Sequence, residues 1–379
     1  CRLLCHSDGA HIQQVYTGLS MLHRAGVIEL TQEIVPPPPP RQTAAQHVRD
    51  AWRTHATVVV RDGPVVRFDM HDACDIDSSD LAGCDFYVKR SYAKAIHDRL
   101  PGGTEKVLPY GLNYHVLPNH PDRFGLWRAL RLPATARERM RGVLRAMDSA
   151  DVAGLHCRER DFVRSASAAA QARVLFLVTA YDPYDVADRN PEKIEERHRS
   201  NETRALCIRL LRKELGPRFL GGFSHNAYTM ATYGDCLATD VSLTRKEAYL
   251  STMHAHAVCV ATTGLHGSNG WKLAEYVAGA RAIVSERLVY DVPGGFAPER
   301  QYLKFRDAHG CVQQCLRLIQ DAALCDAMRA ANAAYYCQWL RPDALVLNAL
   351  GEALARAQQE AENRLALPLD AIATAPDAQ

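Results

Sequence analysis

The stretch GLHGSNGWKLAEYVAGARAIVSE, residues 264–286, decides the fold of this chain. It follows the apolar run AVCVATTG, and it combines a glycine-rich turn, a short amphipathic helix and a second apolar strand. A strand that leads through such a turn into a helix places the turn at the carboxyl end of the strand. Open α/β sheets bind their ligands at this edge. The stretch therefore predicts both an α/β fold and a ligand site at the turn.

The same alternation of strands and helices extends in both directions from this stretch. Downstream of residue 173 the runs VLFLV, NETRALCIRLLRKELG, RFLGGF and RKEAYLSTMHAH read as strand, helix, strand and helix. In the first half, RLLC, VIELTQEIV, ATVVVRDGPVVRFDM, CDFYV and EKVLPYGLNYHV read as strands, the third with a turn at Asp62 and Gly63. Two successive runs predict an α/β chain with two doubly wound, parallel, Rossmann-like domains that face a central cleft.

Composition changes along the chain indicate where these domains begin and end. An Arg- and Ala-rich helical region ends in RSASAAAQAR, which predicts an N-terminal domain at 1–171 and a C-terminal domain at 172–335. Only helices follow, and we expect those at 336–364 to pack back on the N-terminal domain. The proline run at 35–43 is expected to be a surface loop, and the tail at 365–379 to be frayed.

Overall composition excludes two classes of protein. The 379 residues are 47% hydrophobic and contain no apolar run long enough for a transmembrane segment. The 45 basic and 43 acidic residues nearly cancel, so no sequence-wide footprint for nucleic acid exists. The 12 scattered cysteines, without paired spacing, favour reduced thiols and a cytoplasmic location. The opening CRLLC reads as a strand and not as a signal peptide.

The glycine turn has the features of an anion site. Backbone N–H groups of Ser268, Asn269 and Gly270 would point outward at a helix N-terminus, where phosphate oxygens bind readily. Gly264, Gly267 and Gly270 are expected to permit positive φ and close approach of a bulky anion. The turn lacks the GxxxxGK[ST] pattern of a phosphate-binding loop, and no GxGxxG follows the first strand.

Two charged residues follow the turn on the helix. Lys272 would add a positive charge, and Glu275 could accept two hydrogen bonds from a ribose diol. The structural alternative is that the glycines only permit a tight turn, while Lys272 and Glu275 form a solvated pair three residues apart. Residue spacing alone does not decide between the two.

KLAEYVAGARAIVSE resembles the EAMAxGxPVI signature of GT-B glycosyltransferases. The longer stretch KEAYLSTMHAHAVCVATTGLHGSNGWKLAEY looks like the nucleotide-sugar end of exostosin-type members, and KVLPYGLNY is loosely similar to their PNGVD element. The resemblance covers roughly residues 245–290. It implies a GT-B fold and a nucleotide-sugar donor, with Glu275 at the ribose-binding glutamate and GSNG at the diphosphate loop. Gly267 stands where many retaining members carry a second glutamate, so the stereochemical outcome stays open.

Three further residues are candidates for donor binding. Arg204 shares a helical stripe with apolar residues, which points its guanidinium inward, where it could neutralise a leaving diphosphate. Tyr181 follows a strand at its carboxyl end, and His266 precedes the phosphate turn. The alternatives are an Arg whose stem covers apolar surface, and ordinary loop residues.

The acceptor side should supply a general base at the strand ends of the first domain. His11, Asp69 and Asp72 are the candidates, from HSDGAH and DMHDACD, because His or a carboxylate usually removes the acceptor proton. Each could equally cap or fill a turn. Lys89 and Arg90 are expected to flank a solvated helix.

The sequence thus predicts a hexosyl- or pentosyltransferase that moves a sugar from a nucleotide-diphosphate sugar to an acceptor hydroxyl. The acceptor would be a glycan, a lipid-linked molecule or a protein. No metal or other cofactor and no nucleic-acid partner are expected. The alternatives are a nucleotide-sugar 2-epimerase of the same architecture and a non-catalytic module that binds glycans or nucleotides.

Overall fold

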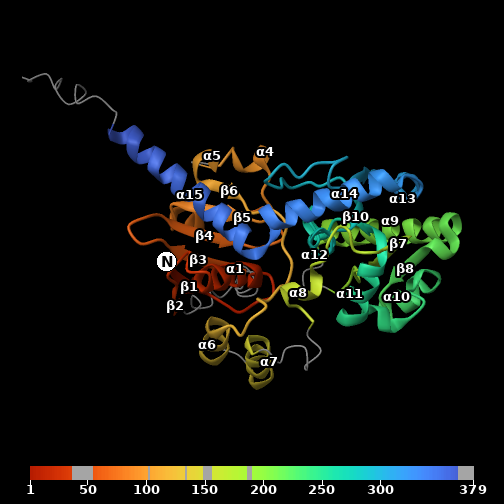
Figure 1. Cartoon of the computed structure of the whole chain (residues 1–379), viewed down its shortest axis with the longest axis horizontal. Coiled ribbons are helices and arrows are strands. Elements are labelled where there is room, and N and C mark those ends of the chain that lie inside the picture. Colours follow the sequence, from red (N-terminus) through yellow and green to blue (C-terminus); the bar gives the residue numbers. More distant parts are fainter. Residues whose placement is uncertain (36–53, 101–102, 133–134, 148–155, 186–189, 366–379) are drawn as a thin grey trace, which may run out of the picture.

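The computed structural model describes residues 1–35, 54–100, 103–132, 135–147, 156–185 and 190–365 (Figure 1). Its described strands form two sheets, which we use to define an N-terminal and a C-terminal unit. The predicted proline loop lies almost entirely outside the described residues, as does nearly all of the predicted frayed tail. The expected α/β class with two doubly wound units is confirmed by the strand orders given below.

The sheet of the N-terminal unit has the order β2-β1-β3-β4-β5-β6. Its strands are β1 Arg2–Cys5, β2 Thr31–Ile34, β3 His55–Val59, β4 Val65–Asp69, β5 Phe86–Lys89 and β6 Val107–Pro109. Strand β3 runs antiparallel to both of its neighbours, β1 and β4. The expectation of an all-parallel sheet is therefore wrong here. A tight turn at Asp62, whose φ is 55°, joins β3 to β4, and strands joined in this way must be antiparallel.

Helices flank this first sheet. They are α1 Gln13–Arg24, α3 Ser78–Ala82, α4 Lys94–His97, α5 Gly103–Lys106, α6 Arg123–Arg131, α7 Ala136–Ala146 and α8 Glu159–Phe162. Helix α1 buries Val15 and Leu19 against the sheet residues Leu3 and Phe68, in one apolar core. Helices α6 and α7 form a hairpin at the lower edge of the unit (Figure 1).

The sheet of the C-terminal unit is parallel throughout, with the order β11-β10-β9-β7-β8. Its strands are β7 Gln171–Val178, β8 Phe219–Phe223, β9 His256–Ala261, β10 Ala282–Glu286 and β11 Leu303–Phe305. The chain winds outward from β7 in one direction to β8 and then in the other direction through β9. The gap between β7 and β9 is therefore a topological switch point, where doubly wound sheets bind ligands.

Helices cover both faces of this second sheet. One face packs on α9 Pro191–Leu215 and α13 Ala308–Gln320. The other face packs on α11 Lys246–Ala255 and α12 Trp271–Ala278. The remaining elements are α10 Ala227–Thr232, α14 Ala322–Tyr335 and the short helices η1 Gly216–Arg218, η2 Gly234–Cys236, η3 Val241–Thr244 and η4 Leu265–Gly267.

The chain returns to the N-terminal unit at its end. A π-helix, η5 Tyr336–Leu340, leads into α15 Pro342–Leu365, which lies across the N-terminal unit against α1 (Figure 1). Gln14 donates through Nε2 to the carbonyl of Leu340 at 3.1 Å. A Cβ on Gly18 of α1 would lie 2.2 Å from the carbonyl oxygen of Pro342, so only glycine permits this close packing. The predicted domain limits stay a prediction.

None of the described helices combines the length and the apolar character that crossing a bilayer requires.

Candidate functional site

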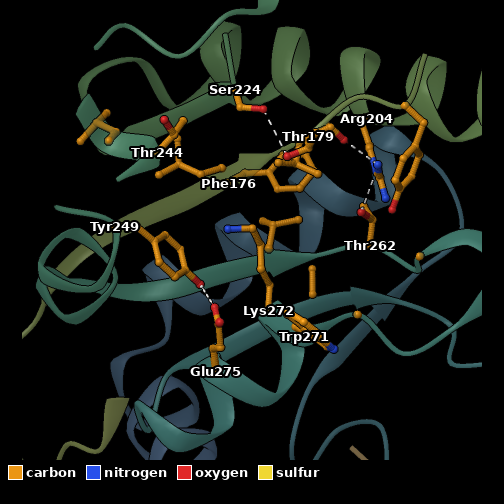
Figure 2. Close-up of a pocket in the computed structure, with 18 of the residues that line it drawn as sticks. Phe176, Thr179, Arg204, Ser224, Thr244, Tyr249, Thr262, Trp271, Lys272 and Glu275 are labelled. Atoms are coloured by element: carbon orange, nitrogen blue, oxygen red, sulfur yellow. Dashed lines mark hydrogen bonds between the residues drawn. The ribbon is translucent and has the colours of Figure 1, made fainter. Parts of the chain in front are cut away.

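A cavity of about 470 Å³ opens at the carboxyl ends of β7 and β9 (Figure 2). It therefore lies at the switch point of the C-terminal sheet, where the topology predicts a ligand. Its lining residues come from the C-terminal unit: Phe176, Leu177, Val178, Thr179, Tyr181, Arg204, Ser224, Leu243, Thr244, Lys246, Tyr249, Val260, Ala261, Thr262, Gly264, Gly270, Trp271, Lys272 and Glu275. Six of the ten predicted donor-binding residues line it. The other four, His266, Gly267, Ser268 and Asn269, do not.

The glycine turn beside the cavity is tight, but not for the expected reason. Of its three glycines only Gly267 has a positive φ, 67°, whereas Gly264 and Gly270 have φ of −82° and −65°. His266 adopts the left-handed conformation instead, at φ 59°. A Cβ at Gly264 would lie 2.5 Å from Oγ of Ser268, so a larger residue there would displace this hydroxyl. Of the three glycines expected to permit positive φ, only Gly267 therefore uses this freedom.

The N–H groups of this turn are only partly available to a ligand. Ser268 donates its N–H to the carbonyl of Leu265 at 3.1 Å, so this group is already used within the turn, contrary to expectation. The N–H groups of Asn269 and Gly270 make no hydrogen bond to the described part of the chain. They precede α12, whose first turn has no intrahelical acceptors, and they leave a positively polarised helix start.

Glu275 lies in the cavity wall and is almost fully buried. Its Oε1 accepts from Nζ of Lys246 at 2.5 Å. Its Oε2 accepts from the hydroxyl of Tyr249 at 2.7 Å (Figure 2). Burial alone would raise the pKa of Glu275, but the charges of Lys246 and Lys272 outweigh burial and lower it. The carboxylate is therefore ionised and held in one orientation.

Lys272 is not the ion-pair partner of Glu275 that the structural alternative required. Its Nζ lies 3.8 Å from the centre of the Tyr249 ring, a cation–π contact, and its side chain lines the cavity. Burial lowers the pKa of Lys272 to about 8, although Glu275 acts in the opposite direction. The ammonium group has no carboxylate partner among the described residues, so its charge is available to an anion.

Arg204 reaches the cavity from α9, as its helical stripe predicts. Its guanidinium donates to Oγ1 of Thr262 at 3.0 Å and to the carbonyls of Thr179 and Thr263 at 2.8 and 2.9 Å. The group also lies over the ring of Tyr181, 4.7 Å from its centre. These contacts fix the guanidinium without neutralising it, because no carboxylate pairs with it in the described part of the chain.

His266 is tied to the wall behind the turn. Its N–H donates to Oε1 of Glu196 at 2.6 Å, and its carbonyl accepts from the hydroxyl of Tyr290 at 2.6 Å. These two bonds hold the left-handed residue in place. His266 therefore shapes the turn from outside the cavity.

Asp69, a predicted base, lies in a buried ion cluster at the end of β4. Its Oδ2 accepts from Lys89 at 2.6 Å and from Tyr87 at 2.8 Å, and its Oδ1 accepts from the N–H of His71 at 2.8 Å. Burial opposes ionisation, but the charge of Lys89 outweighs it and holds the pKa of Asp69 well below its usual range. A carboxylate so occupied is a poor proton acceptor, so the predicted role does not fit this geometry.

Arg90 joins the other two predicted bases to the glycine turn. It ion-pairs with Asp72, donates to Nδ1 of His11 at 3.2 Å, and donates across the unit boundary to the carbonyl of Asn269 at 2.9 Å. Both Arg90 and Lys89 are buried, so the expectation that they flank a solvated helix is wrong. Because Nδ1 of His11 accepts a bond, its neutral ring carries the proton on Nε2. Burial and the charge of Arg90 lower the pKa of His11.

Trp271 lies between histidines of the N-terminal unit. Its indole is 4.8 Å from the ring of His11 and 6.3 Å from that of His115. Several polar side-chain atoms around it are buried without a partner in the described residues: Nε1 of Trp271, both amide atoms of Asn269, Nε2 of His115 and Oδ1 of Asn113. Such atoms are costly to leave unpaired, and they suit a polar occupant.

The described residues contain no cluster of His, Cys, Asp and Glu side chains arranged to hold a metal ion. All twelve cysteines are free thiols, and Cys311 and Cys315 are buried on α13.

No family model matches the chain, and no curated protein is similar to it in sequence. Some solved structures resemble it at low identity. A glycosyltransferase from Rickettsia africae is 8% identical over 90% of this chain and 81% of its own, with a TM-score of 0.42. Anabaena Alr3699/HepE, solved with UDP and glucose, is 11% identical over 96% and 98%, with a TM-score of 0.34. A putative UDP-N-acetylglucosamine 2-epimerase from Listeria monocytogenes is 10% identical over 94% and 96%, with a TM-score of 0.36.

At such identities and TM-scores, the likeness assigns no activity to this chain. The activity has to come from the residues of the cavity.

Sequence reasoning missed four residues of this site: Lys246, Tyr249, Trp271 and Arg90. Lys246 and Tyr249 are three residues apart at the start of α11, which places them on one helical face. The sequence RKEAYL shows this spacing, but Glu275, the partner of both residues, lies 29 residues beyond Lys246. Contacts of this range depend on how α11 and α12 pack beside each other and leave no local signal.

Proposed function

We propose that the chain is a glycosyltransferase that moves a sugar from a nucleotide-diphosphate sugar to an acceptor hydroxyl without a metal ion. One observation carries the proposal. The cavity at the switch point has two cations, Arg204 and Lys272, that pair with no carboxylate of the described residues, and an oriented carboxylate, Glu275. This combination matches a ligand that has an anionic diphosphate and a diol.

The diphosphate would lie between Lys272, Arg204 and the start of α12. Two positive side chains and the N–H groups of Asn269 and Gly270 supply charge and donors where a metal would otherwise be needed. The ribose hydroxyls would donate to Glu275, whose oxygens each keep a lone pair beside the bonds from Lys246 and Tyr249. Apolar lining residues such as Phe176 and Leu243 would then contact the nucleobase of the donor.

In the transfer step, the bond between the anomeric carbon and the diphosphate oxygen breaks, and a bond to the acceptor oxygen forms. The leaving diphosphate gains negative charge, which Lys272 and Arg204 stabilise. The acceptor proton would pass to a base of the N-terminal unit. Asp72 is the better candidate, because Nε2 of His11 carries a proton while Arg90 donates to Nδ1.

The unpartnered polar atoms around Trp271 support a place for the sugar. The indole lines the cavity and also contacts the N-terminal unit, so a sugar attached to the diphosphate would lie between the two units. Its hydroxyl groups could pair with Asn269, Asn113 and His115. Buried amides and imidazoles beside an aromatic ring are suited to a polyhydroxylated ligand.

The proposal is tested by isothermal titration with UDP-, GDP-, dTDP- and CMP-sugars and then with Glu275→Gln. We expect one donor to bind, and the variant to bind it about tenfold or more weakly, because a charged acceptor of hydrogen bonds is lost. Glu247→Gln, on the exposed face of α11, is the matched control and should bind like the wild type. Equal binding by the two variants would refute the role of Glu275, and failure of every donor would refute the function.

Turnover measurements separate the alternatives. Release of nucleotide that requires an added acceptor supports transfer. Change of the donor without an acceptor indicates an epimerase, and binding without turnover across many acceptors indicates a recognition module.

A further inference from the structure

We propose that the hairpin of α6 and α7 docks the protein on the surface of an anionic phospholipid membrane. Helix α7 is largely exposed. Residues 136–141 of α7 are all exposed, and the helix buries only Gly142 and Ala146. A helix that buries two small residues leaves most of its circumference to another partner.

The buried side of α7 packs on α6, and α6 packs on the body of the N-terminal unit. A Cβ on Gly142 would lie 2.7 Å from Cβ of Ala129, so the two helices are in close contact. Arg128 of α6 donates to Asp8 and to Gln32, each at 3.3 Å. Among the described residues, the hairpin is therefore anchored on one side and uncovered on the other, at the lower edge of the molecule (Figure 1).

The free side of α7 is apolar with basic borders. Met140, Leu144 and Met147 are spaced by four and three residues, which places them on one face. Met140 is 61% exposed and Met147 is 49% exposed. Arg137 and Arg141 follow the same spacing along one border of this face.

Helix α6, which packs on α7, also has exposed apolar and basic residues. Trp127, Leu130 and Arg131 lie on one side of it, Leu130 is 53% exposed, and the guanidinium of Arg131 is 6.0 Å from the Trp127 ring. Tryptophan and arginine are the residues that settle at the boundary between lipid head groups and acyl chains.

Charge selects the kind of membrane. Residues 121–147 contain seven arginines and two acidic residues, whereas the whole chain has a formal charge of only +2. One of these acids, Asp122, is buried against Arg128. A local excess of positive charge is attracted to anionic lipids, and the apolar face then inserts among them. A nucleic acid would satisfy the arginines but would leave the exposed methionines in water.

The hairpin also lies beside the edge of the N-terminal sheet at which an acceptor is expected. Arg128 of α6 contacts Asp8, and Asp8 follows β1 in the loop that leads to His11. A lipid surface held there would be close to the N-terminal part of the site. The docking proposal itself does not depend on the proposed function.

The test is flotation of the whole protein with vesicles of phosphatidylcholine alone and of phosphatidylcholine mixed with phosphatidylglycerol. We expect binding only to the mixed vesicles, with a bound fraction that falls as salt is added. Binding to neither vesicle, or equally to both at every salt concentration, would overturn the proposal.

Two variants locate the surface. Arg137→Gln with Arg139→Gln and Arg141→Gln should lower the partition coefficient by roughly 100-fold, because each arginine contributes about fivefold near an anionic surface. Met140→Ser with Met147→Ser should lower it by about tenfold and leave its salt dependence unchanged. Arg218→Gln with Arg300→Gln and Arg306→Gln, three exposed arginines of the C-terminal unit, is the matched control and should bind as the wild type does.

Equal losses in the control and in the arginine variant would place the membrane contact elsewhere and overturn the proposal. A different outcome is that the methionine variant binds vesicles as well as the wild type does and that the protein binds single-stranded RNA as tightly as vesicles. This outcome would show a general polyanion surface and would also overturn the proposal. Thermal melting of each variant confirms that its fold is intact, and all these side chains are exposed.

Discussion

The carboxyl edges of the two sheets are built alike but balance their charges differently. Both sheets place a switch point next to their first strand, and both present polar residues there. In the N-terminal unit the buried cations have carboxylate partners, in the pairs Lys89–Asp69 and Arg90–Asp72. In the C-terminal unit Arg204 and Lys272 have no carboxylate partner among the described residues.

On the proposed function, charge balance rather than topology distinguishes the edge that binds an anion from the edge that does not. A paired charge offers little net field to a ligand, whereas an unpaired one near a low-dielectric wall attracts it strongly. The N-terminal edge therefore holds its own structure together, and the C-terminal edge is available for a diphosphate. Three predictions break or sharpen this contrast.

The largest effect is expected on folding, from Asp69→Asn in the N-terminal unit. The variant leaves Lys89 charged and fully buried without a counter-ion, so the free energy of unfolding should fall by about 3–5 kcal/mol, as measured in urea. Asp326→Asn is the control, because it removes an exposed partner of Arg329 and should cost about 1 kcal/mol or less. Similar losses in the two variants would mean that the buried cluster is not structural.

The second prediction concerns pH and Lys272. The pKa of this side chain is lowered from 10.5 to about 8, so affinity for a nucleoside diphosphate should fall by up to about tenfold per pH unit above 8. The unfolded chain keeps this proton up to about pH 10.5, so the contribution of Lys272 to the stability of the free protein should rise between pH 8 and 10.5.

Titration calorimetry and urea unfolding across this range measure the two slopes. Lys272→Met should remove both pH dependences. A parallel change of affinity and stability with pH in the wild type would contradict the assignment.

The smallest effect is expected from Arg90→Lys at the boundary between the units. A lysine cannot donate to Asp72 and to the carbonyl of Asn269 with one rigid fork, so acceptor-dependent kcat should fall by about fivefold. Nucleotide affinity should change less than twofold, because Arg90 does not line the cavity. Arg67→Lys is the control. Arg67 lies on β4 of the same sheet and pairs with Asp80 of α3, so kcat should not change in this variant. An equal loss of nucleotide affinity would show that Arg90 belongs to the donor site.

Local patterns predicted most of the fold because they depend on neighbours in the chain. The apolar runs around β7 and β9 and the stripe that carries Arg204 were sufficient to place strands, a helix and a cavity edge. The reversed β3 is also encoded, since the Asp62 turn itself requires antiparallel strands, although the alternation of strands with helices in this half favours a parallel sheet.

What the sequence did not predict depends on contacts between distant segments. The bond between Glu275 and Lys246 joins two helices, and the link from Arg90 to Asn269 joins two units. The left-handed backbone of His266 depends on its bonds to Glu196 and Tyr290. No local rule assigns positive φ to a histidine next to a glycine, and no periodicity reveals which carboxylate neutralises which cation.

The return of α15 to the first sheet has a mechanical consequence. The polypeptide passes between the two bodies once before β7 and again through η5, so they are connected at two separate places. Two connections restrict relative motion more than one would, because any displacement of one body against the other has to be accommodated at both places at once.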